Sequence, residues 1–79
     1  MSENPEEPKK PAELTKLSGI AIDMDLSSEL RTKAIDLIGN LGGHESLLAL
    51  LELAANENLN VNERDLALKR AREIIKSGR

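Results

Sequence analysis

The sequence predicts an all-α fold, a compact domain in which four helices form antiparallel helical hairpins. Apolar residues recur at spacings of three and four in four segments, which is the period of an α-helix. No segment alternates apolar and polar residues, and the 79 residues include only one Val against 14 Leu. Glycine and polar residues separate the four segments. One domain of residues 11–79 is therefore expected.

The first predicted helix spans residues 11–22. Pro11 is suitable as the first helical residue because its missing N–H would have no helical partner there. Glu13 then lies near the positive end of the helix dipole, whereas Gly19 weakens the helix. The segment before it, residues 1–10, contains no Leu, Ile or Val, so we expect it to be disordered. The apolar face consists of Leu14, Leu17 and Ala21.

The second predicted helix spans residues 28–41 and has the clearest helical period. Ser27 is expected to be the N-cap, and Glu29 suits the first turn. Gly42-Gly43 should end the helix, with one glycine in the left-handed conformation. The apolar stripe consists of Leu30, Ala34, Leu37, Ile38 and Leu41.

The third predicted helix, residues 45–56, is apolar around most of its circumference. Such a helix lies in the centre of a domain, covered on more than one side. Either the first and fourth helices cover it, or it exposes a patch for a partner or a second copy. Its main stripe is Leu47, Leu50, Leu51 and Ala54, and Leu48, Leu53 and Ala55 widen it.

The fourth predicted helix spans residues 63–77. Asn62 is expected to be its N-cap, with Asp65 in the place that a capping box gives to Glu or Gln. Val61 and Leu66 would form a hydrophobic staple across this cap. Gly78 lies just past the expected end. Its apolar side consists of Leu66, Leu68, Ala71, Ile74 and Ile75.

The predicted second and third helices, joined only by Gly42-Gly43-His44, carry small and aliphatic residues in a repeat-like pattern. These are Arg31, Ala34, Ile35, Ile38, Leu41 and Gly42, followed by Leu47, Leu50, Leu51 and Leu53. On these residues, 27–55 resembles a single HEAT repeat of the short type with a glycine turn. Ser28 and His44 depart from the proline and aspartate that the family often has.

The fourth helix resembles the first helix of a following repeat. Arg64 and Ala67 stand 33 residues after Arg31 and Ala34. The resemblance implies a fragment of an α-α superhelix that binds other proteins. A compact four-helix domain that is only similar to repeats is the alternative, because repeat stacks need about three units to be stable alone.

The composition argues against catalytic and cofactor chemistry. The chain has no Cys, Phe, Tyr or Trp and one histidine, His44. Beside Glu45, that histidine lacks the further ligands that a metal site requires. Asp23 and Asp25 lack a companion base, and Gly42-Gly43 lacks the lysine of a phosphate loop. We therefore expect no catalytic, metal or cofactor site, and no enzyme activity.

Charge is distributed unevenly along the chain, whose net charge is −3. Residues 60–79 contain six basic and three acidic residues, whereas residues 11–59 contain three basic and eight acidic residues. The spacing of Lys69, Arg72, Lys76 and Arg79 predicts a basic face, with Arg70 beside it. The alternative is a solvated face with helical ion pairs Asp65–Lys69 and Arg70–Glu73. The polar N-terminus and the lack of a long apolar run predict a cytoplasmic chain without a membrane span.

The function predicted from these features is a non-catalytic protein-interaction or scaffolding module with a helical surface and charged rims. A protein partner is expected, and weak association between copies is possible in principle. The alternative is binding of nucleic acid or an anionic surface by the basic face of the last helix. A DNA-reading helix-turn-helix over 28–56 fits poorly, because its second helix is apolar. The candidate partner-binding residues are Arg31, Lys33, Lys69, Arg72 and Lys76.

Overall fold

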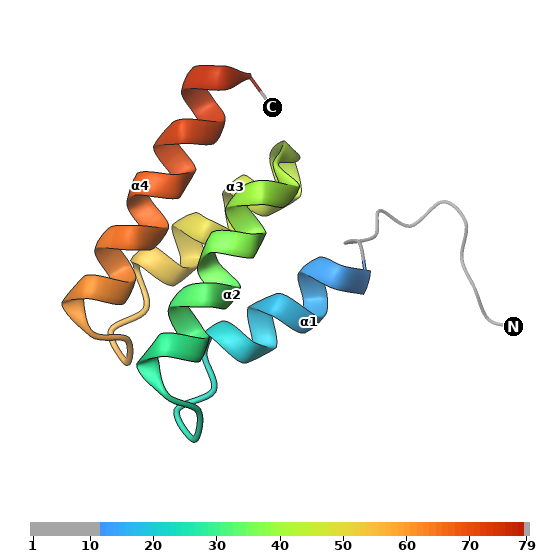
Figure 1. The fold of residues 1–79 in the computed structure, drawn as a ribbon. Helices are drawn as coiled ribbons and strands as arrows, with labels where there is room; N and C mark the ends of the chain where they lie inside the picture. Colours follow the sequence, from blue (N-terminus) through green and yellow to red (C-terminus); the bar gives the residue numbers. More distant parts are fainter. Residues whose placement is uncertain (1–11, 79) are drawn as a thin grey trace, which may run out of the picture.

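The computed structural model describes residues 12–78, and it contains four α-helices and no strand within this range (Figure 1). The helices are α1 (Ala12–Ala21), α2 (Ser28–Leu41), α3 (Gly43–Ala54) and α4 (Val61–Ser77). The all-α, four-helix prediction is confirmed. The predicted disorder of residues 1–10 and the role of Pro11 lie outside the described residues.

The four helices form two hairpins that pack against each other. Helix α1 packs on α2, and α3 packs on α4, while α2 and α4 form the main contact between the hairpins. Figure 1 shows α2 and α4 side by side and running in the same direction. The hairpins are therefore residues 12–41 and 43–77, one helix out of phase with the unit of 27–55 that the sequence suggested.

The two hairpins are built on one repeated turn. In each, the residue two after an Asp or Asn donates its N–H to that side chain: Asp25 to Asp23 Oδ1 and Asn58 to Asn56 Oδ1, both at 2.9 Å. Leu26 and Leu59 donate their N–H groups to the same two residues' carbonyls, at 3.0 and 3.1 Å. These Asx turns reverse the chain between antiparallel helices. Equivalent residues lie 33 apart.

Helix α2 begins as predicted, whereas α4 begins two residues earlier than predicted. The side chain of Ser27 accepts the N–H of Leu30, which confirms this N-cap. The N-cap of α4 is Asn60 and not Asn62, and Asn60 forms a complete capping box with Glu63. The box predicted at Asn62 has Asp65 three residues after the cap, whereas Asn60 has at that place the Glu that a capping box usually contains, Glu63.

The predicted hydrophobic staple of Val61 and Leu66 is wrong. Val61 is the first residue of α4 and is 65% exposed, so it does not precede the cap. The buried apolar residue before the cap is Leu59. At the other end, Gly78 adopts the left-handed conformation, with φ 73° and ψ 19°, and its N–H donates to Ile74 O. The predicted C-terminal stop is thus confirmed.

The junction between the hairpins consists of two glycines with positive φ. Gly42 has φ 69° and Gly43 has φ 87°, values that side chains with a Cβ rarely adopt. Helix α3 can therefore begin at Gly43, two residues before the predicted start. It ends at Ala54, two residues early, because the Asx turn at Asn56 follows at once.

The core lies between the hairpins and is wholly aliphatic. Leu50 of α3 is fully buried at its centre, whereas Leu51 is 40% exposed, so Leu51 does not belong to the core stripe that the sequence suggested. Helix α3 packs mainly on α4 and little on α1, and Leu48 is 43% exposed, so the prediction that it is the central helix is wrong: α2, which packs on both α1 and α4, has that place. The buried apolar residues are Leu14, Ala21, Ala34, Ile35, Ile38, Ala49, Leu50, Leu53, Leu59, Ala67, Ala71 and Ile74.

Candidate interaction surfaces

A buried ion pair joins the first turns of α2 and α4. Arg31 Nη2 lies 2.7 Å from Glu63 Oε2, and Arg31 Nε donates to the same oxygen at 3.1 Å. The Ser28 hydroxyl also donates to Oε2, and the Asn60 N–H donates to Oε1 at 3.1 Å. Arg31 is 7% exposed and Glu63 is 0% exposed. The pair therefore connects the two hairpins inside the molecule.

The environment of Glu63 keeps its carboxylate ionised. Burial by itself raises the pKa of this group. Hydrogen bonds from Arg31, Ser28 and the Asn60 backbone, together with the positive charge of Arg31, lower the pKa by more than burial raises it. The result is a pKa below the ordinary value of 4.5. The charges of Arg31 and Glu63 neutralise each other, so this cluster holds the hairpins together and offers no free acid, base or nucleophile.

The placement of Arg31 corrects one candidate from the sequence. A buried guanidinium held by Glu63 and by the Leu26 carbonyl cannot be a residue of a binding rim. Glu63, the partner of Arg31, is not among the residues that the sequence indicated. Two signals could have revealed it: Asn60 and Glu63 match a capping box, and the Asn-x-Asn-Leu-Asn run at 56–60 parallels Asp-x-Asp-Leu-Ser at 23–27.

A second polar contact joins the hairpins further along α2 and α4. Arg70 Nη2 donates to Asn40 Oδ1 at 2.6 Å and to Asp36 O at 3.2 Å, and Nη1 donates to Glu73 at 2.9 Å. The Arg70 side chain crosses α2 at Gly39, where an added Cβ would lie 2.3 Å from Nε. The predicted Arg70–Glu73 pair is thus present, as part of a contact between hairpins.

The other four candidate residues are exposed, but they lie on two different surfaces. Lys33 of α2 lines a depression with residues of α1. Lys69, Arg72 and Lys76 lie on the side of α4 opposite to Glu63, which faces α2. Within residues 12–78, no ion pair engages these three cations. The structure therefore does not gather the sequence-based candidates into one site.

The outer side of the first hairpin is apolar, and we call it the α1/α2 face. Two adjoining depressions on this face share Leu17 and Leu37. Leu37 is 44% exposed, a value close to those of its exposed neighbours. Glu13, Lys16, Lys33 and Asn40 border the apolar area. Its apolar residues are Leu17, Ile20, Leu30, Leu37 and Leu41.

Each residue of the α1/α2 face has an equivalent, 33 positions later, that contacts the first hairpin or is buried in the core. The equivalents of Leu30 and Leu37 are Glu63 and Arg70, which reach across to α2. The equivalents of Leu17, Ile20 and Leu41 are all buried: Leu50, Leu53 and Ile74. The α1/α2 face therefore consists of the positions at which one hairpin packs on the preceding hairpin.

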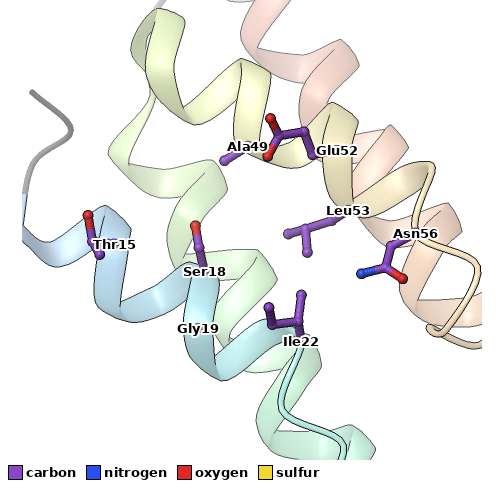
Figure 2. A pocket seen from close by; sticks show the side chains of 8 residues that line it. All are labelled: Thr15, Ser18, Gly19, Ile22, Ala49, Glu52, Leu53 and Asn56. Atoms are coloured by element: carbon purple, nitrogen blue, oxygen red, sulfur yellow. The ribbon is translucent and has the colours of Figure 1, made fainter. Parts of the chain in front are cut away.

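A groove also runs between α1 and α3, which contact each other little (Figure 2). Its polar groups are the hydroxyls of Thr15 and Ser18, the carboxylate of Glu52 and the amide of Asn56. Figure 2 shows Gly19 next to Ser18 on α1, and outside its own stretch of helix no atom lies within 4 Å of the place where its Cβ would be. The side chains of Thr15, Glu52 and Asn56 can hydrogen-bond a ligand, whereas Ser18 Oγ is shielded from solvent. The other lining residues are Ile22, Ala49 and Leu53.

The remaining polar candidates have structural positions. Asp23 accepts backbone N–H groups in its turn, and His44 is exposed in the first turn of α3. Among residues 12–78, no three His, Cys, Asp or Glu side chains lie close enough together to hold a metal ion. None of the four described helices has the length and hydropathy of a transmembrane segment.

Comparisons with protein-family models, with curated proteins and with solved structures found no match for the chain.

Proposed function

We propose that this chain is a non-catalytic protein-interaction or scaffolding module that binds a helical partner through the α1/α2 face. One observation carries the proposal: the exposed apolar residues of this face stand at positions that form the contact between hairpins elsewhere in the same molecule. Covering a surface of this composition with an apolar helical surface lowers the free energy, because apolar side chains are removed from water. HEAT-like stacking of a partner's helices is the corresponding mode of binding.

The charged rim of the face would select the partner. Lys33 lies beside Leu30 and Leu37, and Glu13 and Lys16 border the second depression. Charges at the edge of an apolar contact affect orientation and association rate more than affinity. We assign Lys33 to this rim, as the sequence suggested, whereas Arg31 is excluded from it by its burial.

The proposal is tested by affinity capture with Leu37→Glu and a matched control. Leu48 of α3 is 43% exposed, as Leu37 is 44%, but it lines none of the depressions of the α1/α2 face. Proteins bound by the native chain and by Leu48→Glu should be lost with Leu37→Glu. Circular dichroism should show native helix content in both variants. Captured proteins that are identical for all three chains would contradict the proposal.

A second candidate function is binding of nucleic acid or another anionic surface by α4. The observation in its favour is the exposure of Lys69, Arg72 and Lys76 along one side of this helix. Phosphate contacts release counterions, so binding to duplex DNA should weaken steeply as salt is raised. A gel-shift series at varied salt tests this, and affinity no tighter than millimolar at low salt would exclude it. The cytoplasmic location is also a proposal, tested by fractionation of cells with a tagged chain.

A further inference from the structure

The second hairpin has an outer side that complements the α1/α2 face, and we call it the α3/α4 face. A depression on it is lined by Ala54, Val61, Arg64, Asp65 and Leu68. Val61, Arg64 and Leu68 stand 33 residues after Ser28, Arg31 and Ile35. Ser28 and Arg31 contact Glu63 of the second hairpin, and Ile35 is fully buried. The α3/α4 face thus corresponds to the side of a hairpin that receives the next one.

We propose that the partner of the α1/α2 face is the α3/α4 face of a second copy of this chain, so that copies stack head to tail. This inference rests on the proposed function, because it names the occupant of the same surface. The contact inside the molecule joins two different surfaces, the α2 side of one hairpin and the α4 side of the next. When molecules repeat that contact, the α1/α2 face of each one binds the α3/α4 face of the next. One face of each kind then remains uncovered, at the two ends of the stack.

The chemistry of the two outer faces is compatible with this stacking. Inside the molecule, Glu63 and Arg70 make polar contacts with the first hairpin. In the proposed contact, Leu30 and Leu37 of the second copy would stand at the equivalent positions. Leu30, in the place of Glu63, would contact Val61 and the aliphatic stem of Arg64, whose guanidinium donates to the Ala54 carbonyl. Burial of Leu30 thus replaces the ion pair of the internal contact, whose charges cost desolvation.

The 33-residue correspondence also places the charged residues near Leu37. Inside the molecule, Arg70 lies against Asp36 and crosses α2 at Gly39. In the proposed contact, Leu37 takes the place of Arg70, and Lys69 and Arg72 of the other copy take the places of Asp36 and Gly39. Glu13 and Lys16 line the same depression as Leu37, so one charge of each sign would lie near these two cations.

The experiment uses one blocking variant for each face and then mixes them. Leu37→Lys places a positive charge on the α1/α2 face, opposite Lys69 and Arg72 of the other copy, and Leu68→Glu places a negative charge on the α3/α4 face. Each variant keeps its other face, so neither can self-associate alone, but an equimolar mixture can form a single head-to-tail contact. Sedimentation equilibrium from micromolar to millimolar chain concentration measures the masses, and circular dichroism verifies folding. Ile20→Glu and Val61→Glu form a second pair if either first variant unfolds.

The expected results are specific to a head-to-tail contact. The mass of the native chain and of the Leu48→Glu control should rise beyond a dimer as concentration increases. Each blocking variant should be monomeric, with association weakened more than about tenfold, and the mixture should form a dimer and nothing larger. A native chain that is monomeric at millimolar concentration, a blocking variant that dimerises alone, or a mixture that stays monomeric would overturn the inference.

The two proposals fail in distinguishable ways. If the native chain is monomeric but Leu37→Glu still loses captured proteins, the α1/α2 face binds a different protein and only the self-association is wrong. If the mixture dimerises and affinity capture shows no further partner, the face serves contacts between copies. If neither result is obtained, both the proposed function and this inference are wrong.

Discussion

At the scale of single residues, the Arg31–Glu63 pair is the most informative feature of the molecule. Both side chains are buried, and every carboxylate oxygen of Glu63 accepts at least one hydrogen bond. Replacing a whole buried pair by apolar residues is often neutral, but removing one partner leaves a buried charge without compensation. The pair should therefore contribute to how the hairpins align more than to the total free energy of unfolding.

Arg31→Met should lower the free energy of unfolding by roughly 3–5 kcal/mol, because Glu63 would remain buried without its counterion. Arg64 is the matched control, since it occupies the equivalent position 33 residues later and donates to the Ala54 carbonyl. Arg64→Met should cost only about 1 kcal/mol, the typical loss of one hydrogen bond. Urea unfolding measures both. Equal losses of unfolding free energy in the two variants would show that the ion pair contributes no more than a single hydrogen bond.

Glu63→Gln should change how stability depends on pH. The pKa of Glu63 is lower in the folded chain than its ordinary value of 4.5, so its contribution is fully present above that value. The contribution is lost as pH falls through the folded pKa. The difference in unfolding free energy between the native chain and Glu63→Gln should therefore be constant above pH 4.5 and shrink below it. Urea titrations at several pH values measure this, and a constant difference throughout would contradict it.

At the scale of elements, short local motifs determine where each helix begins and ends. The Asx turns at Asp23 and Asn56 end α1 and α3 and are followed by N-caps at Ser27 and Asn60. The second of these starts has the larger set of hydrogen bonds, because Glu63 closes the capping box and also pairs with α2. The start of α4 is thus both a local signal and part of the contact between hairpins.

Asn60→Ala should lower the free energy of unfolding by about 1–2 kcal/mol, since it removes the N-cap acceptor of α4. The matched control is Asn62→Ala, two residues later on the exposed side of the first turn. There alanine should be neutral or slightly stabilising, because its helix propensity exceeds that of asparagine. Thermal unfolding of both variants measures the effect. A larger loss for Asn62→Ala would mean that the helix begins at the later position.

Substitutions of two neighbouring leucines test which side of α3 is buried. Leu50→Ala should cost about 2–5 kcal/mol, because Leu50 is fully buried and its removal leaves a cavity. Leu51→Ala should cost about 1 kcal/mol or less, because Leu51 already contacts water. Chemical denaturation of the two variants compares them. A reversed order would show that α3 is rotated about its axis from the orientation described.

At the scale of the whole molecule, neither hairpin encloses its own core. Ile35 and Ile38 of α2 are fully buried, and so are Ala67 and Ala71 of α4, on the helices that form the main contact between hairpins. Separation would expose these residues and leave Arg31 and Glu63 without each other. Stability is therefore a property of the two hairpins together.

A chain of residues 12–42 should show little helix by circular dichroism, because isolated helices shorter than about 12–15 residues are marginal in water. The intact chain should unfold in one cooperative transition, with coincident midpoints for probes placed in each hairpin. A strongly helical fragment, or two separate transitions in the intact chain, would show that each hairpin folds by itself.

Local patterns in the sequence determined much of this structure. The helical period, the Ser27 cap and Gly78 were sufficient to predict four helices and two of their ends, because these signals act within one or two turns. The start of α4 was misplaced because Asn60 and Asn62 are both suitable caps, and only Glu63 distinguishes them. That distinction was present in the sequence, as was the repeated turn.

Which side chains meet across the molecule was decided by the tertiary structure alone. Arg31 looked like a surface cation because its partner lies 32 residues away, and helical periodicity says nothing about how α2 and α4 are aligned. Likewise, Leu50 and Leu51 share one apolar stripe in the sequence, but only the packing of α3 against its neighbours makes one of them buried and the other exposed. Local spacing identifies the apolar residues of each helix, but packing decides which of them are buried: Leu30, Leu37 and Leu41 of the stripe predicted for α2 are exposed, whereas Ile35, outside that stripe, is fully buried against the second hairpin.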